Sequence, residues 1–194
     1  MSARRVIQIG DPRLKNKNKS IVDFVDKRLG FLIADLKDTM NKTGLVGIAA
    51  PQIGRNFCIF VTHPRNTGTR NIGKEDVFRV YINPQITHFS PEKTIIYEGC
   101  GSVAKGQLFG PVKRPREITI EAFNEKGEKF ELTTDGLLAR VIQHEYDHMT
   151  GIEFTEKIFD YKKITSRSTY IANIRDAAET KKLLEITKIE YKNC

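Results

Sequence analysis

The sequence contains little cysteine and has no long apolar run. Its three cysteines, Cys58, Cys100 and Cys194, are too few and too widely spaced for a disulfide scaffold, so we expect free thiols in a reducing, cytoplasmic compartment. No apolar stretch approaches the length that a membrane-spanning helix needs. The apolar stretch near the N-terminus is also too brief for a signal peptide. The sequence therefore predicts neither a leader peptide nor a membrane anchor.

Length and charge set further bounds. A chain of 194 residues with 39% hydrophobic content can bury one core but is short for two, so residues 1–194 are predicted to form a single domain. The net charge is +8, and residues 162–194 contain eight basic and four acidic side chains. Apolar residues at helical spacing from about Asp160 onward predict a long, basic, amphipathic C-terminal helix. Basic ends suit contact with an anionic surface such as RNA, although a solvated charged face explains them as well.

Histidine is also scarce, yet two of the four histidines lie four residues apart, at His144 and His148. Residues at this spacing share one face of an α-helix, so the two imidazoles can bind one metal ion. Glu145 lies about 100° round the helix from His144, where it can reach a water on the ion rather than the ion itself. This is the H-E-x-x-H arrangement of metal hydrolases, which supplies two ligands and a general base.

A catalytic site of this kind needs a third ligand and an open position for water. One zinc-protease pattern places a third histidine shortly after a glycine. Here Gly151 is present, but Phe154 occupies the histidine position. Another pattern places a glutamate on a following helix, and residues 165–169 offer no carboxylate. The third ligand is therefore expected upstream, where Cys100, between two glycines at the end of a strand, is the best-placed candidate.

The remaining patterns predict a mixture of strands and helices. One amphipathic helix is expected from about Ile21 to Met40, ending near Gly44, and the helix with the histidines should begin at Thr134 or Asp135. Residues 5–9 read as a short strand or extended arm, strands are expected at 56–61, 77–84 and 94–98, and 117–123 and 129–133 should form a hairpin. The predicted fold class is α+β, with antiparallel β-sheets packed around a central metal-binding helix and with an N-terminal and a C-terminal helix.

Three segments together resemble the peptide deformylase family. Residues 44–52 (GLVGIAAPQ) are similar to its first motif, residues 98–102 (EGCGS) to its second and residues 143–151 (QHEYDHMTG) to its third, in the same order and spacing. The resemblance implies a metal site of Cys100, His144 and His148 that holds Fe²⁺, with Zn²⁺, Ni²⁺ or Co²⁺ also accepted. It also implies that Glu145 acts as general base and then general acid while water attacks a formyl carbon.

The same resemblance implies how a substrate would be held. The side-chain amide of Gln52 and the backbone N–H of Gly101 would stabilise the oxyanion. The segment from Gly44 to Gly47, together with Gly99, would contact the peptide. The pocket for the methionine side chain would be lined by Val46, Ile96, Leu137 and Val141. The implied reaction removes the formyl group from N-formylmethionine at the start of nascent chains and releases formate, and the basic C-terminal helix would contact the ribosome.

Two departures from the family pattern concern the second motif. Gly101 replaces a larger residue, and residues 103–109 lack the proline and arginine found there in many members. Lys105 is the candidate to replace that arginine in holding the peptide. Two other functions compete at this point: a zinc endopeptidase that uses the same helix, and a metal-stabilised module that binds ribosomal RNA through its basic ends.

Overall fold

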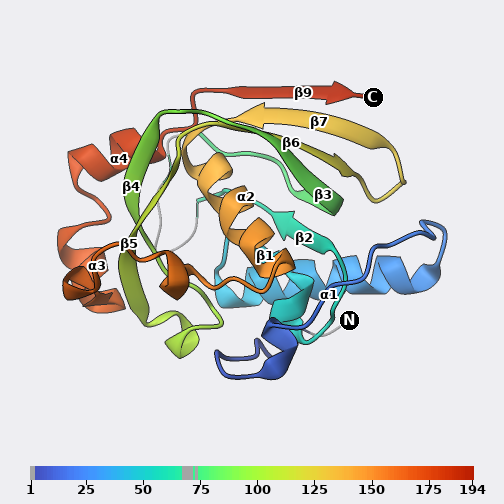
Figure 1. The fold of residues 1–194 in the computed structure, drawn as a ribbon, viewed down its shortest axis with the longest axis horizontal. Coiled ribbons are helices and arrows are strands. Elements are labelled where there is room, and N and C mark those ends of the chain that lie inside the picture. The colour runs from blue at the N-terminus through green and yellow to red at the C-terminus, as the bar shows by residue number, and fades with distance from the viewer. Residues whose placement is uncertain (1–2, 67–71, 73) are drawn as a thin grey trace.

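The structure is a computed structural model that describes residues 3–66, 72 and 74–194. In these residues a six-stranded and a three-stranded antiparallel sheet enclose a central helix (Figure 1). The larger sheet has the order β1 (Gly47–Ala49), β2 (Ile59–Thr62), β3 (Arg79–Phe89), β6 (Ile118–Phe123), β7 (Lys129–Thr134), β9 (Ile189–Asn193). The smaller sheet has the order β4 (Lys93–Glu98), β5 (Leu108–Pro115), β8 (Thr165–Ser166). The α-helices are α1 (Lys27–Thr43), α2 (Gly136–Met149), α3 (Arg167–Asn173) and α4 (Ala178–Leu184). The predicted α+β class is confirmed.

The central helix α2 begins where the sequence predicted, directly after Asp135, and ends before Gly151. It lies in the middle of the molecule with strands of both sheets beside it (Figure 1). Leu138, Ala139 and Ile142 are fully buried in the core against the larger sheet. On a helix in this position an unpaired polar side chain is costly, because it lies away from water.

The first helix starts later than its apolar periodicity predicted. We expected it from about Ile21, but α1 begins at Lys27, because the side chain of Asp26 accepts a hydrogen bond from the Arg28 N–H at 2.8 Å and caps the helix there. Val25, an apolar residue inside the range expected to be helical, lies outside the helix and is 91% exposed. The end of the helix is as predicted, with Gly44 in the left-handed conformation at φ 69°.

Most of the expected strands are present with shifted ends. The predicted hairpin is confirmed as β6 and β7, which pair from Ile118 and Thr134 to Phe123 and Lys129. The strand expected at 56–61 is β2, which starts at Ile59, and the strand expected at 77–84 continues in β3 as far as Phe89. Residues 5–9 form an extended arm rather than a strand. Strands β1, β5, β8 and β9 were not predicted.

The prediction of one long C-terminal helix is wrong. Residues from Tyr161 onward instead form a short 3-10 turn, β8, α3, α4 and β9. In Figure 1, α3 and α4 lie beside β4 and β5, and the chain then crosses to β9 at the edge of the larger sheet. β9 pairs with β7 from Ile189 opposite Thr134 to Asn193 opposite Phe130. Pairing with an open strand edge satisfies backbone groups that a helix would otherwise satisfy internally.

The segment 185–188, between α4 and β9, is hydrogen-bonded to the start of α2. The carboxylate of Asp135 accepts hydrogen bonds from the backbone N–H groups of Thr187 at 2.8 Å and Lys188 at 2.9 Å, and from the Thr187 hydroxyl. Gly136 has φ +58°, and a Cβ there would clash with the carbonyl of Glu185. This close approach brings Ile186, which is 3% exposed, into the core beside α2.

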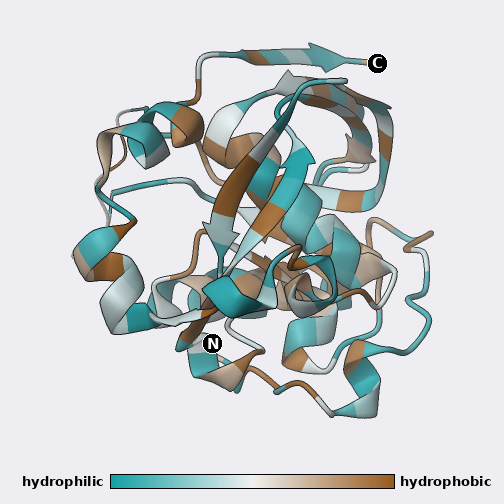
Figure 2. Ribbon diagram, turned by 60° about the vertical axis from the view of Figure 1, so that its left-hand side comes forward, coloured by the Kyte–Doolittle hydropathy of each residue, from teal (hydrophilic) through white to brown (hydrophobic). Residues whose placement is uncertain are grey.

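The distribution of apolar residues follows this architecture. Apolar segments gather in the central helix and the strands around it, whereas the terminal strand beside the C label is mainly hydrophilic (Figure 2). This agrees with β9, in which four of the five residues are exposed. Within the described part of the chain, no helix has the length and apolar character that crossing a bilayer requires.

Candidate metal centre

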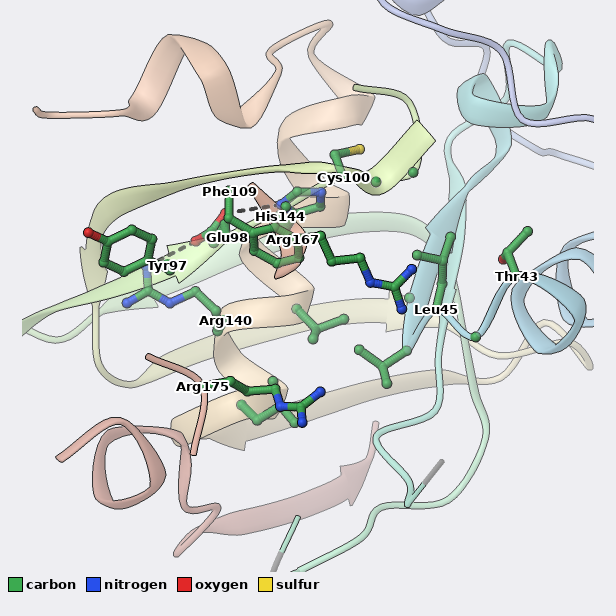
Figure 3. Close-up of a pocket in the computed structure, with 18 of the residues that line it drawn as sticks. Thr43, Leu45, Tyr97, Glu98, Cys100, Phe109, Arg140, His144, Arg167 and Arg175 are labelled. Carbon is green, nitrogen blue, oxygen red and sulfur yellow. Dashed lines mark hydrogen bonds and ion pairs between the residues drawn. The ribbon is translucent and has the colours of Figure 1, made fainter. Parts of the chain in front are cut away.

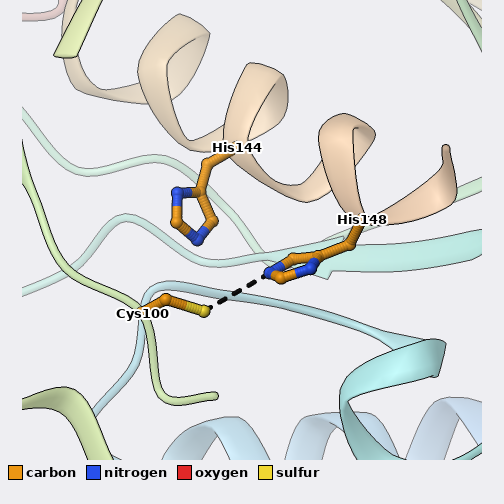
Figure 4. A group of neighbouring side chains, drawn as sticks. All are labelled: Cys100, His144 and His148. Carbon is orange, nitrogen blue, oxygen red and sulfur yellow. Dashed lines mark hydrogen bonds between the residues drawn. The ribbon is translucent and has the colours of Figure 1, made fainter. Parts of the chain in front are cut away.

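Helix α2 and the segment after β4 bring three metal-ligating side chains together. His144 and His148 project from one face of α2, and Cys100 approaches from the chain that follows β4 (Figure 4). One ligand atom of each residue lies within 4.8 Å of the others, and the Cys100 Sγ is 3.4 Å from the His148 Nε2. His148 and Cys100 are 1% and 2% exposed. One sulfur and two nitrogens in a buried cluster form a donor set that suits a divalent transition metal.

The sulfur of Cys100 is held by hydrogen bonds from two other motif residues. The Gln52 Nε2 lies 3.3 Å from the sulfur, and the Ser102 backbone N–H lies 3.4 Å from it. Gln52 is itself fixed, because its Oε1 accepts a hydrogen bond from the Ala49 N–H at 2.7 Å. These two donors fix the position of the sulfur, and the thiolate of a cysteine is the form that binds a metal.

The N-terminal arm ties these two segments together. The Ile7 N–H donates to the Gln52 carbonyl at 2.9 Å, and the Ile9 N–H donates to the Ser102 carbonyl at 2.7 Å. The Gln8 side chain adds a hydrogen bond to the Gly101 carbonyl at 2.9 Å. The arm therefore bridges the first and second motifs, although it belongs to neither sheet.

A buried ion-pair network orients His144, and our sequence reasoning missed it. The Glu98 carboxylate contacts the His144 Nδ1 at 3.0 Å, Arg114 at 2.7 Å and Arg140 at 3.0 Å. Arg114 also reaches Asp147 at 2.7 Å. Burial alone would raise the pKa of Glu98, but the charge of Arg114 and the hydrogen bond with His144 outweigh burial and hold that pKa well below its usual range.

This network decides which nitrogen of His144 could bind an ion. With its Nδ1 held by Glu98, His144 presents Nε2 as the nitrogen available to an ion, as outer carboxylates do in other histidine sites. A signal for the network was present in the sequence: Arg140 lies four residues before His144 and interrupts an otherwise apolar run at 137–142. A charged residue at a buried position is nearly always paired.

Phe154 occupies the position where one class of zinc protease has its third histidine ligand. It is 1% exposed, and its ring packs against the His144 ring with the centroids 6.2 Å apart and the planes at 28°. Phe154 therefore supports His144 by packing and offers no donor atom of its own.

Glu145 is a buried carboxylate beside the cluster. It is 4% exposed, and its Oε2 has no hydrogen-bond partner among the described residues. Burial raises the pKa of Glu145 to about 7, although the nearby His144 acts in the opposite direction. A buried carboxylate with one unpaired oxygen can exchange a proton with a group that enters the site.

Gly47 leaves the space that Glu145 occupies. A Cβ at this position would lie 2.5 Å from the Val141 Cγ1 and 2.7 Å from the Glu145 Oε1, closer than real Cβ contacts allow. Gly47 of the first motif is therefore needed for the packing of Glu145 of the third motif, because any larger side chain would displace that carboxylate.

We expect Gly47→Ala to displace the Glu145 carboxylate and lower kcat/KM by about 100-fold, since a shift of about 1 Å in a reacting group can cost this much. The measurement is steady-state kinetics with metal content determined in parallel. Gly30→Ala is the matched control, because a Cβ at this α1 position meets nothing within 4 Å. Equal rates for Gly47→Ala and the unaltered protein would contradict the prediction.

A cavity of about 1070 Å³ opens onto the cluster. Its lining includes all the residues predicted to bind substrate, namely Gly44, Val46, Gly47, Ile96, Gly99, Leu137 and Val141. It also includes Gln52, Cys100, Gly101, His144 and Glu145, whereas His148 lies behind the wall. Figure 3 shows Cys100, Glu98 and His144 at one side of this cavity, with Leu45 and Thr43 on the other. The structure thus gathers the three motif segments around one space.

Gly101 in the second motif and Lys105, three residues after that motif, have different surroundings. A Cβ on Gly101 would lie 3.1 Å from the Leu45 Cδ1, so Leu45 fills part of the space that a larger residue would take. Lys105 has φ 53° and is exposed at the cavity lining, where its N–H donates to the Gln8 Oε1 at 2.8 Å.

The family model for polypeptide deformylase matches residues 3–164. The chain belongs to this family. A relative from Pseudothermotoga lettingae, a peptide deformylase, is 39% identical over 177 residues, which cover 91% of this chain and 95% of the relative. One from Christiangramia forsetii is 40% identical over 176 residues, covering 87% and 88%. As a member of the deformylase family the protein is an enzyme, and neither a protease nor an RNA-binding module is supported.

Solved structures of deformylases show the same fold. The class I type b peptide deformylase from Acinetobacter baumannii with Met-Ala-Ser bound aligns with a TM-score of 0.77 at 31% identity, over 81% of this chain and all of that one. The Thermotoga maritima peptide deformylase aligns with a TM-score of 0.71 at 31% identity, over 82% and 100%. The deformylase family is metal-dependent, and the sulfur-and-imidazole cluster with the unpaired oxygen of Glu145 fits an ion at this site.

Proposed function

We propose that this deformylase removes the formyl group from N-formylmethionine at the start of nascent polypeptides and releases formate. The observation that supports this proposal most directly is the meeting of Cys100, His144 and His148 within 4.8 Å, at the wall of a cavity that Gln52 and Glu145 also line. A divalent ion, when bound here, supplies Lewis-acid chemistry that makes water acidic enough to attack a carbonyl near neutral pH.

We assign the proton transfers to Glu145. Its unpaired oxygen faces no donor within the described protein, so it is available to take a proton from water and to return one to the departing amine. The Gln52 amide and the Gly101 backbone N–H would stabilise the negative oxygen that forms on the formyl carbon. Loss of one such donor costs about 2.7–4 kcal/mol of transition-state stabilisation in comparable sites.

The methionine side chain would occupy the apolar part of the cavity. Val46, Leu137 and Val141 belong to one buried core cluster and are each 7–9% exposed, and Ile96 on β4 is 5% exposed. The flexible, unbranched thioether of methionine suits such a wall. The backbone from Gly44 to Gly47, with Gly99 opposite, would leave room for the extended peptide.

We propose Fe²⁺ as the ion, with Zn²⁺, Ni²⁺ and Co²⁺ as alternatives that the same donor set accepts. A thiolate with two imidazoles is intermediate between soft and hard ligation, and it suits these ions better than Mg²⁺ or Ca²⁺, which prefer oxygen. Metal analysis of protein purified without oxygen and without added metal tests this assignment.

A formate-release assay decides the proposed function. Formyl-Met-Ala-Gln-amide should yield one formate for each new amine. The same peptide with an N-terminal acetyl group should yield no acetate, and no internal peptide bond should be cleaved in either peptide. A chain that cleaves internal bonds and leaves the formyl group in place would refute the proposal.

We further propose that residues 1–194 act as one catalytic domain in the cytoplasm and that the basic segment 162–194 contacts the ribosome. Support comes from its eight basic and four acidic residues and from the exposure of Lys162 and Lys163. Co-sedimentation with ribosomes should then weaken with rising salt and with charge reversal at these two lysines. Binding that is insensitive to both changes would argue against this contact.

A further inference from the structure

The C-terminal segment forms a wall of the substrate cavity that lies beyond the residues matched to the family. The match ends at residue 164, yet α3, α4 and the chain after them contribute Arg167, Tyr170, Arg175, Lys182, Leu184 and Ile186 to the cavity lining. Figure 3 shows the side chains of Arg167 and Arg175 directed from this segment into the cavity. These residues therefore lie outside the segment that the family model matches.

Arg167 is placed by several fixed contacts. Immediately before it, β8 pairs with β5 through Ser166 opposite Leu108, and the Arg167 N–H donates to the Gln107 carbonyl at 2.9 Å. One helical turn later, the buried Tyr170 stacks on Phe109 with the ring centroids 4.2 Å apart and the planes at 10°. Residues three apart on a helix share a face, so the stacking of Tyr170 also turns Arg167 toward the cavity.

The same stack connects Arg167 to the reaction site. A Cβ on Gly99 would lie 2.7 Å from the Phe109 Cζ, so the Phe109 ring lies directly against the backbone that precedes Cys100. A peptide whose formyl group lies at the metal cluster can extend along this wall within the same cavity. Arg167 is therefore placed to face residues that follow the formylmethionine.

The charge at this wall is unbalanced. The exposed side chain of Arg167 has neither a hydrogen-bond nor an ion-pair partner among the described residues, and this is also true of the cavity-lining residues Arg5, Lys42, Lys105 and Lys182. Two exposed acidic residues line the cavity, Asp176 and Glu185. Asp176 is already paired with Arg175 at 2.9 Å and with Lys181 at 3.8 Å, so the positive charges of the lining outnumber the negative ones. A planar guanidinium without a partner is suited to bind a carboxylate through two hydrogen bonds.

We propose that Arg167 is a specificity-determining residue that binds an acidic side chain at the second or third position of the substrate peptide. This inference rests on the proposed deformylase reaction and adds a preference among its substrates. Because the pair forms in a site open to solvent, its effect is modest and falls with salt. It acts on binding, so it appears in KM rather than in kcat.

The test compares peptides that differ only in charge. Formyl-Met-Glu-Ala-amide and formyl-Met-Ala-Glu-amide are each set against the peptide with glutamine in place of glutamate, and the amide removes the terminal carboxylate. At low salt we expect kcat/KM to be about fivefold higher for one of the glutamate peptides, which corresponds to a solvent-exposed ion pair. Arg167→Gln should abolish this ratio, and Arg167→Glu should reverse it.

Two matched variants keep the test specific. Lys162→Ala removes a positive charge from the same segment outside the cavity lining and should keep the preference. Lys105→Ala should also keep it; if Lys105→Ala abolishes the preference and Arg167→Gln does not, the assignment to Arg167 is wrong. Equal rates on glutamate and glutamine peptides at low salt would overturn the proposal outright.

A separate readout distinguishes the inference from the reaction. If no formyl peptide yields formate, the proposed function fails. Calorimetric binding of the N-acetyl forms of the same peptides then decides the inference, because tighter binding of the glutamate form, lost in Arg167→Gln, still supports it. Equal affinity for both acetyl peptides would refute it independently of turnover.

Discussion

A Cys100→Ala variant is expected to lose both its metal and its deformylase activity. The sulfur is the single thiolate donor of the cluster, and its removal leaves two imidazoles on one helix with no donor opposite them. It also removes the acceptor of the Gln52 hydrogen bond. We expect metal content far below one ion per chain. Loss of a residue that only supports a metal ligand can lower activity by roughly 10- to 100-fold, and loss of the ligand itself should lower kcat/KM by more than this.

Metal analysis and the formate assay on the same preparation measure this effect. Cys58→Ala is the matched control, because Cys58 is also a free thiol but lies outside the cluster and the cavity lining. Circular dichroism should show that both variants are folded. A Cys100→Ala protein that keeps one ion per chain and full turnover would rule out the cysteine as a ligand and with it the proposed site.

Glu145→Gln is expected to abolish nearly all turnover while the metal stays bound. Glutamine has the shape of glutamate but cannot accept the proton, and general acid–base groups contribute about 10²- to 10⁴-fold to rate. The loss should fall on kcat, because the carboxylate acts in the reaction rather than in holding the peptide. Metal content should remain that of the unaltered protein, since the proposed ligands Cys100, His144 and His148 are unchanged.

Glu153→Gln provides a close comparison for this variant. Glu153 is also buried, at 1% exposure, and both of its carboxylate oxygens lack a hydrogen-bond partner among the described residues, but it does not line the cavity. Turnover should survive this substitution. If Glu145→Gln keeps its turnover as well, Glu145 is not the general base and another group must take the proton from water.

The errors of the sequence reading have physical causes in particular contacts. Apolar spacing after Asp160 predicted one helix, but the stack of Tyr170 on Phe109 and the capture of Thr187 and Lys188 by Asp135 break the segment into short pieces. Local periodicity carries no information about such distant partners. The missed strand β5 contains Pro111 and Pro115, and proline argues against a strand because it has no N–H to donate. The prolines are tolerated because β8 pairs only with Leu108 and Phe109, before both of them.

Elements whose pattern is decided locally were predictable. Alternation of apolar and polar residues identified the β6–β7 hairpin, and the glycine after Thr43 marked the end of α1. The start of α1 was misjudged because the capping hydrogen bond of Asp26 decided it, whereas the apolar spacing extended further toward the N-terminus. Capping side chains outrank periodicity at helix ends, because the first N–H groups have no partner inside the helix.

The sequence by itself determined the family, the helical spacing of His144 and His148, and the predicted ligand and acid–base roles, which stay predictions until the variants are measured. Only the tertiary structure decided the rest. It set Cys100 against the two histidines, fixed His144 through buried Glu98, and turned Arg167 into the cavity. The physical reason is that spacing along one helix is set by local geometry, whereas contacts between distant segments depend on how sheets and helices pack together.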